Sequence, residues 1–86
     1  MNEVELLSEP KNYAVVRLPS RNFPGVVMQG DTLNILLKDI VRVKTAVTLG
    51  HLADASEGLD DIIGQLEAAK KFYESVCQRK GIDLPY

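Results

Sequence analysis

The spacing of apolar residues changes once along this 86-residue chain, at Gly30-Asp31. Before that point apolar side chains recur at about every second position, and after it they recur at steps of three and four. The shorter period is typical of strands and the longer one of helices. The sequence therefore predicts a sheet followed by helices, within a single domain of residues 1–86.

Three strands are expected before the change in period. Charged and apolar residues alternate in the first, which places Val4 and Leu6 together on a half-buried face. A turn at residues 9–12 and a proline-bounded loop at residues 19–24 separate the strands, and the second is rich in aromatic and β-branched residues. Connections this short predict an antiparallel meander. The expected strands are residues 3–7, 13–18 and 25–29.

Two helices are expected after the change in period, the first from Asp31 to Leu49. Gly50 stands where a left-handed residue would end that helix, and residues 54–57 have the form of a capping box that starts the second. Several β-branched residues leave a strand conceivable over residues 41–47, but no turn signal separates them from the rest of the helix. Each helix carries one apolar stripe that should face the core. The stripes are Leu33, Leu36, Leu37, Ile40, Val43 and Val47 in the first helix and Leu59, Ile62, Ile63, Leu66, Ala69, Tyr73 and Val76 in the second.

These elements predict an α+β fold of order β-β-β-α-α. A three-stranded antiparallel meander (residues 1–29) precedes an antiparallel helical hairpin (residues 31–81) and a tail (residues 82–86), and we expect the hairpin to lie across one face of the meander. Gly81-Ile82 predicts a Schellman ending, with Ile82 folded back onto the last turn. Because a three-stranded sheet has two open edges, we expect a homo-oligomer that forms through a strand edge or through the helices.

Composition and charge narrow the classes of partner. The chain is 45% hydrophobic and 26% charged, as in ordinary soluble globular proteins. Its net charge of −2, without a dense stripe of Lys and Arg, argues against binding to nucleic acid. We expect no membrane segment, because 18 uncharged apolar residues never occur together. A single cysteine and the lack of a signal-like N-terminus favour the cytoplasm.

No residue pattern indicates catalysis, and we expect no enzyme activity, no metal and no cofactor. The chain has one cysteine, Cys77, and one histidine, His51, which are too few ligands for a zinc site. Only this one histidine is available to activate Cys77 as a nucleophile. A packed thiol and a structural histidine at a helix end are the expected roles. Asp60 and Asp61 are neighbours on a helix, where their side chains point about 100° apart. The glycine-rich patterns that bind phosphate are absent.

The candidate binding site is the segment that gathers Arg17, Arg21, Asn22 and Phe23 on and beside the proline-bounded loop. Loops often carry function, and arginine with aromatic residues is favoured at interface hot spots. A solvated loop with Phe23 tucked inside is the other interpretation. Arg17 can also be held by Glu5 across the first hairpin, as an exposed ion pair of little energetic weight.

The order strand, Pro24-Gly25, strand, Gln29-Gly30-Asp31-Thr32-Leu33 and helix resembles the N-terminal half of HicB-type antitoxins, which bind and block a small ribonuclease toxin. This resemblance implies a non-catalytic, antitoxin-like or immunity-like module whose protein partner is of unknown identity. After Leu33 a helical hairpin replaces the usual DNA-binding segment, so DNA binding is not implied.

The whole chain also resembles an uncharacterised bacterial family of small proteins, labelled only as a domain of unknown function. Arg17-Leu18-Pro19, residues 23–27 and the closing residues 81–86 carry that resemblance. It implies no activity. Two other hypotheses therefore stay open, a small-molecule sensor or carrier and an enzyme whose site is shared across a dimer.

Overall fold

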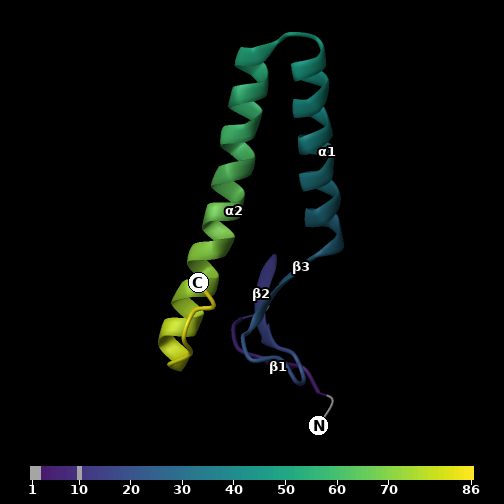
Figure 1. Cartoon of the computed structure of the whole chain (residues 1–86). Coiled ribbons are helices and arrows are strands. Elements are labelled where there is room, and N and C mark those ends of the chain that lie inside the picture. The colour runs from purple at the N-terminus through teal and green to yellow at the C-terminus, as the bar shows by residue number, and fades with distance from the viewer. Residues whose placement is uncertain (1–2, 10) are drawn as a thin grey trace. The chain divides into compact units, whose positions relative to one another are not determined.

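The computed structural model describes residues 3–9 and 11–86. The turn expected at residues 9–12 includes Pro10, which lies outside the described residues. The elements follow the order β-β-β-α-α, which confirms the predicted α+β fold (Figure 1). They are β1 (Glu5–Leu6), β2 (Tyr13–Arg17), β3 (Gly25–Met28), α1 (Gly30–Thr48) and α2 (Leu52–Lys80).

The three strands form the predicted antiparallel meander, in the order β1-β2-β3. The expectation that Val4 and Leu6 share a half-buried face is wrong, because both side chains are more than half exposed and Leu7 is buried instead. Leu7 donates its N–H to the carbonyl of Val15, 2.8 Å away, and so lies opposite the fully buried Val15. Alternation along the strand indicated two faces but not which of them meets a helix.

The chain divides into two compact units, which α2 joins because its residues belong to both. Met1–Gln29 and Ala69–Tyr86 form one, called here the sheet unit, and Gly30–Ala68 forms the other, called the hairpin unit. In the sheet unit, the strands and the last turns of α2 share a core, against which Phe72 and Ile82 are partly buried. Its members are Leu7, Val15, Tyr73, Val76 and Cys77.

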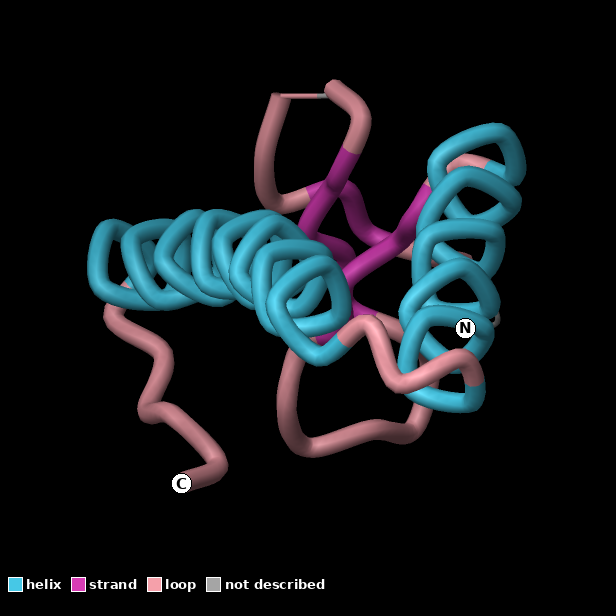
Figure 2. Tube along the Cα trace, turned by 90° about the horizontal axis from the view of Figure 1, so that it is seen from above, coloured by secondary structure: helices cyan, strands magenta, loops and turns pink. Residues whose placement is uncertain are grey.

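The end of α2 is the predicted Schellman motif. Gly81 has a φ of +66°, and the N–H of Ile82 donates to the carbonyl of Cys77 at 2.9 Å. An extended tail follows the helix (Figure 2), and its last residue, Tyr86, donates its hydroxyl proton to Glu74 at 3.0 Å. Burial first, and this hydrogen bond second, raise the pKa of Tyr86 above its ordinary value.

The two helices of the hairpin unit run antiparallel from the turn that contains Gly50 (Figure 1). Gly50 has a φ of +77°, and the N–H of His51 donates to the carbonyl of Ala46, which ends α1 as predicted. Residues 41–47 are helical throughout. The capping box expected at residues 54–57 does not start α2: the N–H of Ala55 already donates to the carbonyl of His51, so the helix begins at Leu52.

The expectation that both apolar stripes face a core is wrong for most of their residues in the hairpin unit. Only Leu36, Ala55 and Ile62 are buried there, among the residues that the structure describes. The helices approach each other where Gly58 meets Val43: a Cβ on Gly58 would lie 2.8 Å from a methyl group of Val43. The contact line between the helices therefore runs along one edge of each stripe, through Leu36 and Ile62, and most of the other large side chains stay outside it.

Candidate functional site

The loop between β2 and β3 is held at both ends. At its start, the N–H of Arg21 donates to the carbonyl of Leu18 at 3.3 Å, and Ser20 adopts a φ of +63° that is rare for a residue with a side chain. At its end, Pro24 is buried and its carbonyl accepts the hydroxyl proton of Tyr73 at 3.0 Å. Hydrogen bonds thus restrain the backbone on both sides of residues 21–23.

Tyr73 is the anchor that the sequence did not reveal. Its ring belongs to the core of the sheet unit, while its hydroxyl group reaches the loop. Burial first, and the neighbouring Cys77 second, raise the pKa of Tyr73, so the hydroxyl keeps its proton and remains a donor. The residue stood within an expected apolar stripe, and the only available signal was that a buried tyrosine usually needs a hydrogen-bond partner.

Three of the four predicted site residues lie together on this loop. Arg21, Asn22 and Phe23 are consecutive and exposed, and 45% of Phe23 is accessible to water. The interpretation that tucks Phe23 inside is therefore not what the structure shows. Aromatic side chains and arginine are enriched at protein–protein interfaces, so the exposed Phe23 beside Arg21 makes this loop a candidate binding surface.

The fourth predicted residue, Arg17, lies at the end of β2 and is paired with β1. Its Nε donates to Oε1 of Glu5 at 3.1 Å, the cross-strand pairing considered from the sequence. Both side chains remain about half exposed, so the ion pair is screened by water and weak. Arg17 therefore belongs to the sheet surface rather than to the loop itself.

A second candidate surface lies on the hairpin unit and consists of large apolar side chains, each 45–66% exposed. On both helices these side chains follow one position after the residues that face the other helix, such as Leu36 on α1 and Ile62 on α2. We call this surface the apolar face. Its members are Leu33, Leu37, Ile40 and Val47 of α1 and Leu52, Leu59, Ile63 and Leu66 of α2.

Helix geometry places the members of the apolar face on one side of the hairpin. Successive side chains on a helix are rotated by about 100°. In two antiparallel helices that lie side by side, the residues that follow the contacting residues therefore project from the same face of the helix pair. The residues one step before the contact line, such as Arg42 and Asp61, line a single groove together. Since those residues share one side of the hairpin, the apolar face occupies the opposite side.

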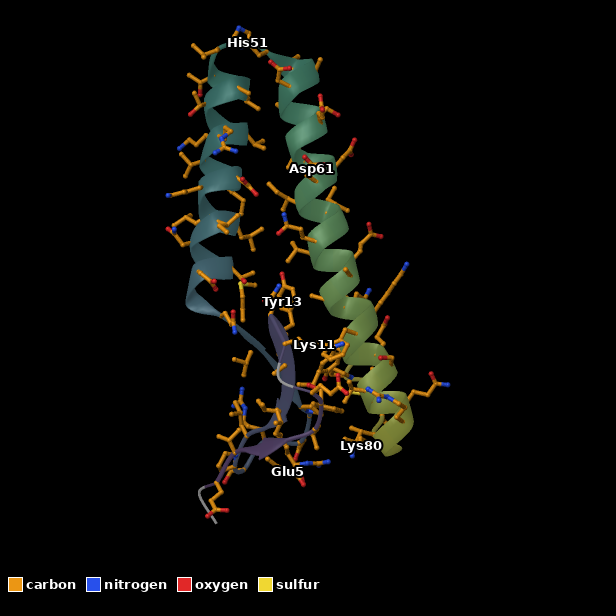
Figure 3. All side chains as sticks on the ribbon, turned by 180° about the vertical axis from the view of Figure 1, so that it is seen from behind. Glu5, Lys11, Tyr13, His51, Asp61 and Lys80 are labelled. Atoms are coloured by element: carbon orange, nitrogen blue, oxygen red, sulfur yellow. The ribbon has the colours of Figure 1, made fainter. Side chains whose placement is uncertain are left out.

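That groove has a volume of about 790 Å³ and is lined by charged side chains together with apolar and uncharged polar ones. Figure 3 shows His51 at the turn and Asp61 further along α2. Asp61 lines the groove, whereas its neighbour Asp60 does not, so the two carboxylates diverge as predicted. Among residues 3–9 and 11–86, no three His, Cys, Asp or Glu side chains are arranged to hold a metal ion. The charged lining residues are Asp39, Arg42, Asp54, Glu57 and Asp61.

Cys77 is fully buried in the core of the sheet unit, which confirms that it is a packed thiol. His51 is exposed at the helix end where the sequence placed it. Neither helix in the described part of the chain is long and apolar enough to cross a bilayer.

Comparison with known proteins gives one match. A family model described as a family of unknown function (DUF6959) matches residues 1–86, the full length of the chain. No curated protein is significantly similar to the chain, and neither is any solved structure.

Proposed function

Because the chain belongs to DUF6959, a family of unknown function, we propose its role from its own structure: it is a non-catalytic module that binds another protein through the loop of residues 18–24. The exposed aromatic ring of Phe23 on a loop fixed at both ends carries this proposal. Aromatic anchors that fill a pocket of the partner, together with arginine, supply much of the energy of protein interfaces.

The fixed backbone favours binding because ordering a free loop costs about 1–2 kcal/mol per residue, and here much of that cost is met in folding. Arg21 and Asn22 directly precede Phe23 in the loop and are exposed. A guanidinium group matches a carboxylate through two parallel hydrogen bonds. The fitting partner therefore offers an apolar pocket bordered by acidic side chains.

An antitoxin-like or immunity-like role in the bacterial cytoplasm is the more specific form of this proposal. Its support is the resemblance of residues 13–33 to HicB-type antitoxins. The buried thiol of Cys77 suits a reducing compartment, and because it is inaccessible it offers no nucleophile. Arg17, already paired with Glu5, would contribute at the margin of the interface.

Co-purification of the tagged chain from its native cells, followed by mass spectrometry, would identify the partner. With that partner in hand, we expect Phe23→Ala and Arg21→Ala each to weaken binding by about fivefold or more, which corresponds to about 1 kcal/mol. Lys71→Ala, an exposed change on α2, is the matched control and should bind as the unchanged chain does. Equal affinity for all three variants would refute a role of the loop in recognition.

The groove of the hairpin unit supports a second candidate, a small-molecule sensor or carrier. Its volume lies within the roughly 300–1,000 Å³ that is typical of ligand pockets. Ligand pockets usually carry only a few polar groups, however, and five charged side chains line this groove, so we rank the candidate second. A thermal-shift screen of small metabolites with the unchanged chain and Asp61→Asn tests it: a ligand that stabilises only the unchanged chain would favour the sensor.

A further inference from the structure

We propose that the apolar face of the hairpin unit binds the same face of a second copy of this chain, so that two hairpins form an antiparallel four-helix bundle. The proposed loop interaction does not require it, because the loop belongs to the sheet unit and the apolar face to the hairpin unit. Three features of the face support this dimer: its area, the positions of the polar residues Lys44 and Ser56 within it, and the charges along its edges.

The exposed area matches what a dimer needs. Eight large apolar side chains at 45–66% exposure leave on the order of 700 Å² of each copy open to water, and a standard interface buries about 800 Å² per partner. The hairpin unit has only three buried residues of its own to hold it together, among those described. A second hairpin would supply the missing half of a core, as helix pairs do in four-helix bundles.

Within the apolar face each helix presents one row of side chains, and the row of α1 is complementary to the row of α2. Their three- and four-residue steps are interrupted once on each helix, by Lys44 on α1 and by Ser56 on α2. Val43 and Gly58 are in contact and therefore lie at about the same height along the helix axes. Lys44 is one residue from Val43 and Ser56 is two residues from Gly58 in the same direction along the axes, so Lys44 and Ser56 differ in height by about one residue rise of 1.5 Å.

Because Lys44 and Ser56 lie at nearly the same height, a two-fold axis parallel to the helices brings them together. It lays α1 of one copy on α2 of the second copy at unchanged height, so Lys44 meets Ser56 of the second copy and apolar positions meet apolar positions. A two-fold axis perpendicular to the helices would lay α1 on α1 of the second copy, so that Lys44 would stand either against Lys44 of the second copy, where like charges repel, or against apolar side chains. The geometry therefore points to the parallel axis, in which adjacent helices are antiparallel.

Charges along the edges fit the same arrangement. Asp60 lies one turn beyond Ser56 on α2 and projects from the outer edge, away from α1. Lys44 of the other copy, which stands opposite Ser56, can reach that carboxylate with its long side chain. The basic position of one helix thus meets an acidic position of the helix that it packs against, which favours this register over others. The charged groove, on the opposite side of each hairpin, stays open.

Sedimentation equilibrium of the full chain tests the proposal. We expect the unchanged chain to be a dimer at about 50 μM, as a dissociation constant in the micromolar range requires. Ile40→Glu, in the apolar face, should give a monomer. The matched control is Ile35→Glu, which also replaces an exposed isoleucine of α1 but lies on the groove side, and it should remain a dimer. Circular dichroism confirms that both variants keep their helices.

A charge exchange then tests the register. Lys44→Asp and Asp60→Lys should each weaken the dimer about tenfold, and the double variant should recover most of the loss. Phe23→Ala should leave the dimer unchanged, which separates self-association from the loop interaction. A monomeric unchanged chain at several hundred micromolar, a folded Ile40→Glu variant that still dimerises, or a double variant no better than the singles would overturn the proposal.

Discussion

The sheet unit and the hairpin unit differ in where their apolar side chains lie. The sheet unit encloses five of them in one core, with Val15, Val76 and Cys77 fully buried. The hairpin unit buries Leu36, Ala55 and Ile62 and leaves eleven large apolar side chains open to water, eight of them in the apolar face. Burial contributes about 25 cal/mol per Å² of apolar surface. The sheet unit therefore gains its stability internally, whereas the stability of the hairpin unit depends on what covers it.

The largest effect is expected in the core of the sheet unit. Leu7→Ala should lower the free energy of unfolding by about 3 kcal/mol, because it removes a buried side chain and leaves a cavity. Leu6→Ala is the matched control, since the neighbouring leucine is more than half exposed and should cost less than about 1 kcal/mol. Urea denaturation measures both values. Similar costs for the two variants would refute the assignment of faces in β1.

A smaller effect is expected where the core meets the loop. Tyr73→Phe keeps the ring and removes the hydrogen bond to the carbonyl of Pro24, which should cost about 1–2 kcal/mol because that carbonyl loses a hydrogen bond in a buried place. The same variant should loosen the loop and weaken partner binding. Denaturation and hydrogen exchange of residues 20–25 measure the two effects, and unchanged exchange would contradict the anchoring role.

The raised pKa of Tyr73 adds a dependence on pH. In the unfolded chain Tyr73 loses its proton near pH 10, whereas in the folded chain it keeps the proton to higher pH, so the folded state binds the proton more tightly. The contribution to stability is complete below pH 10 and is lost as the pH rises through the folded pKa. Unfolding curves between pH 8 and pH 11 should show this alkaline loss in the unchanged chain and a smaller loss in Tyr73→Phe.

Two glycines of α2 test the contact inside the hairpin unit. Gly64→Ala meets no atom within 4 Å and should stabilise the helix by up to about 1 kcal/mol through its better helix propensity. Gly58→Ala gains the same propensity but drives a methyl group into Val43 at 2.8 Å, so its net effect should be neutral or destabilising. Thermal unfolding compares the two, and an equal gain for both would show that the helices do not approach each other at Gly58.

The smallest effect is expected at the ion pair on the sheet surface. Arg17→Ala should change the free energy of unfolding by less than about 1 kcal/mol, because water screens its pairing with Glu5. Glu5→Gln should have a similar effect, and the double change should cost no more than the larger single one. A double-mutant cycle by urea denaturation measures the coupling, and a coupling well above 1 kcal/mol would contradict a screened pair.

The order and type of the elements could be predicted from the sequence because local signals agreed. The period changes at Gly30, and Gly50 and Gly81 end helices in the left-handed conformation that favours glycine. The packing could not be predicted in the same way. A stripe of apolar residues shows that a helix has an apolar side, but the approach of Val43 to Gly58 decides which edge of that side is used inside the chain.

The candidate site, too, could be predicted only in part from the sequence. The exposed group from Arg21 to Phe23 followed from composition and from the flanking prolines. Its anchoring by Tyr73 did not, because that hydrogen bond joins residues 49 positions apart in the sequence. The apolar face is present in the sequence as two stripes, for which the pattern predicts a core, because periodicity does not distinguish a buried side from an unpaired one.

The continuity of α2 through both units has a consequence for the order in which the chain folds. Starting a helix is the costly step, and lengthening an existing one is nearly free. The turns that end near Cys77 are fixed by the core of the sheet unit, so they can serve as the start from which the earlier turns of α2 grow toward Leu52. α1 has no such start within its own length. Its amide protons should therefore exchange with solvent sooner than those around Val76.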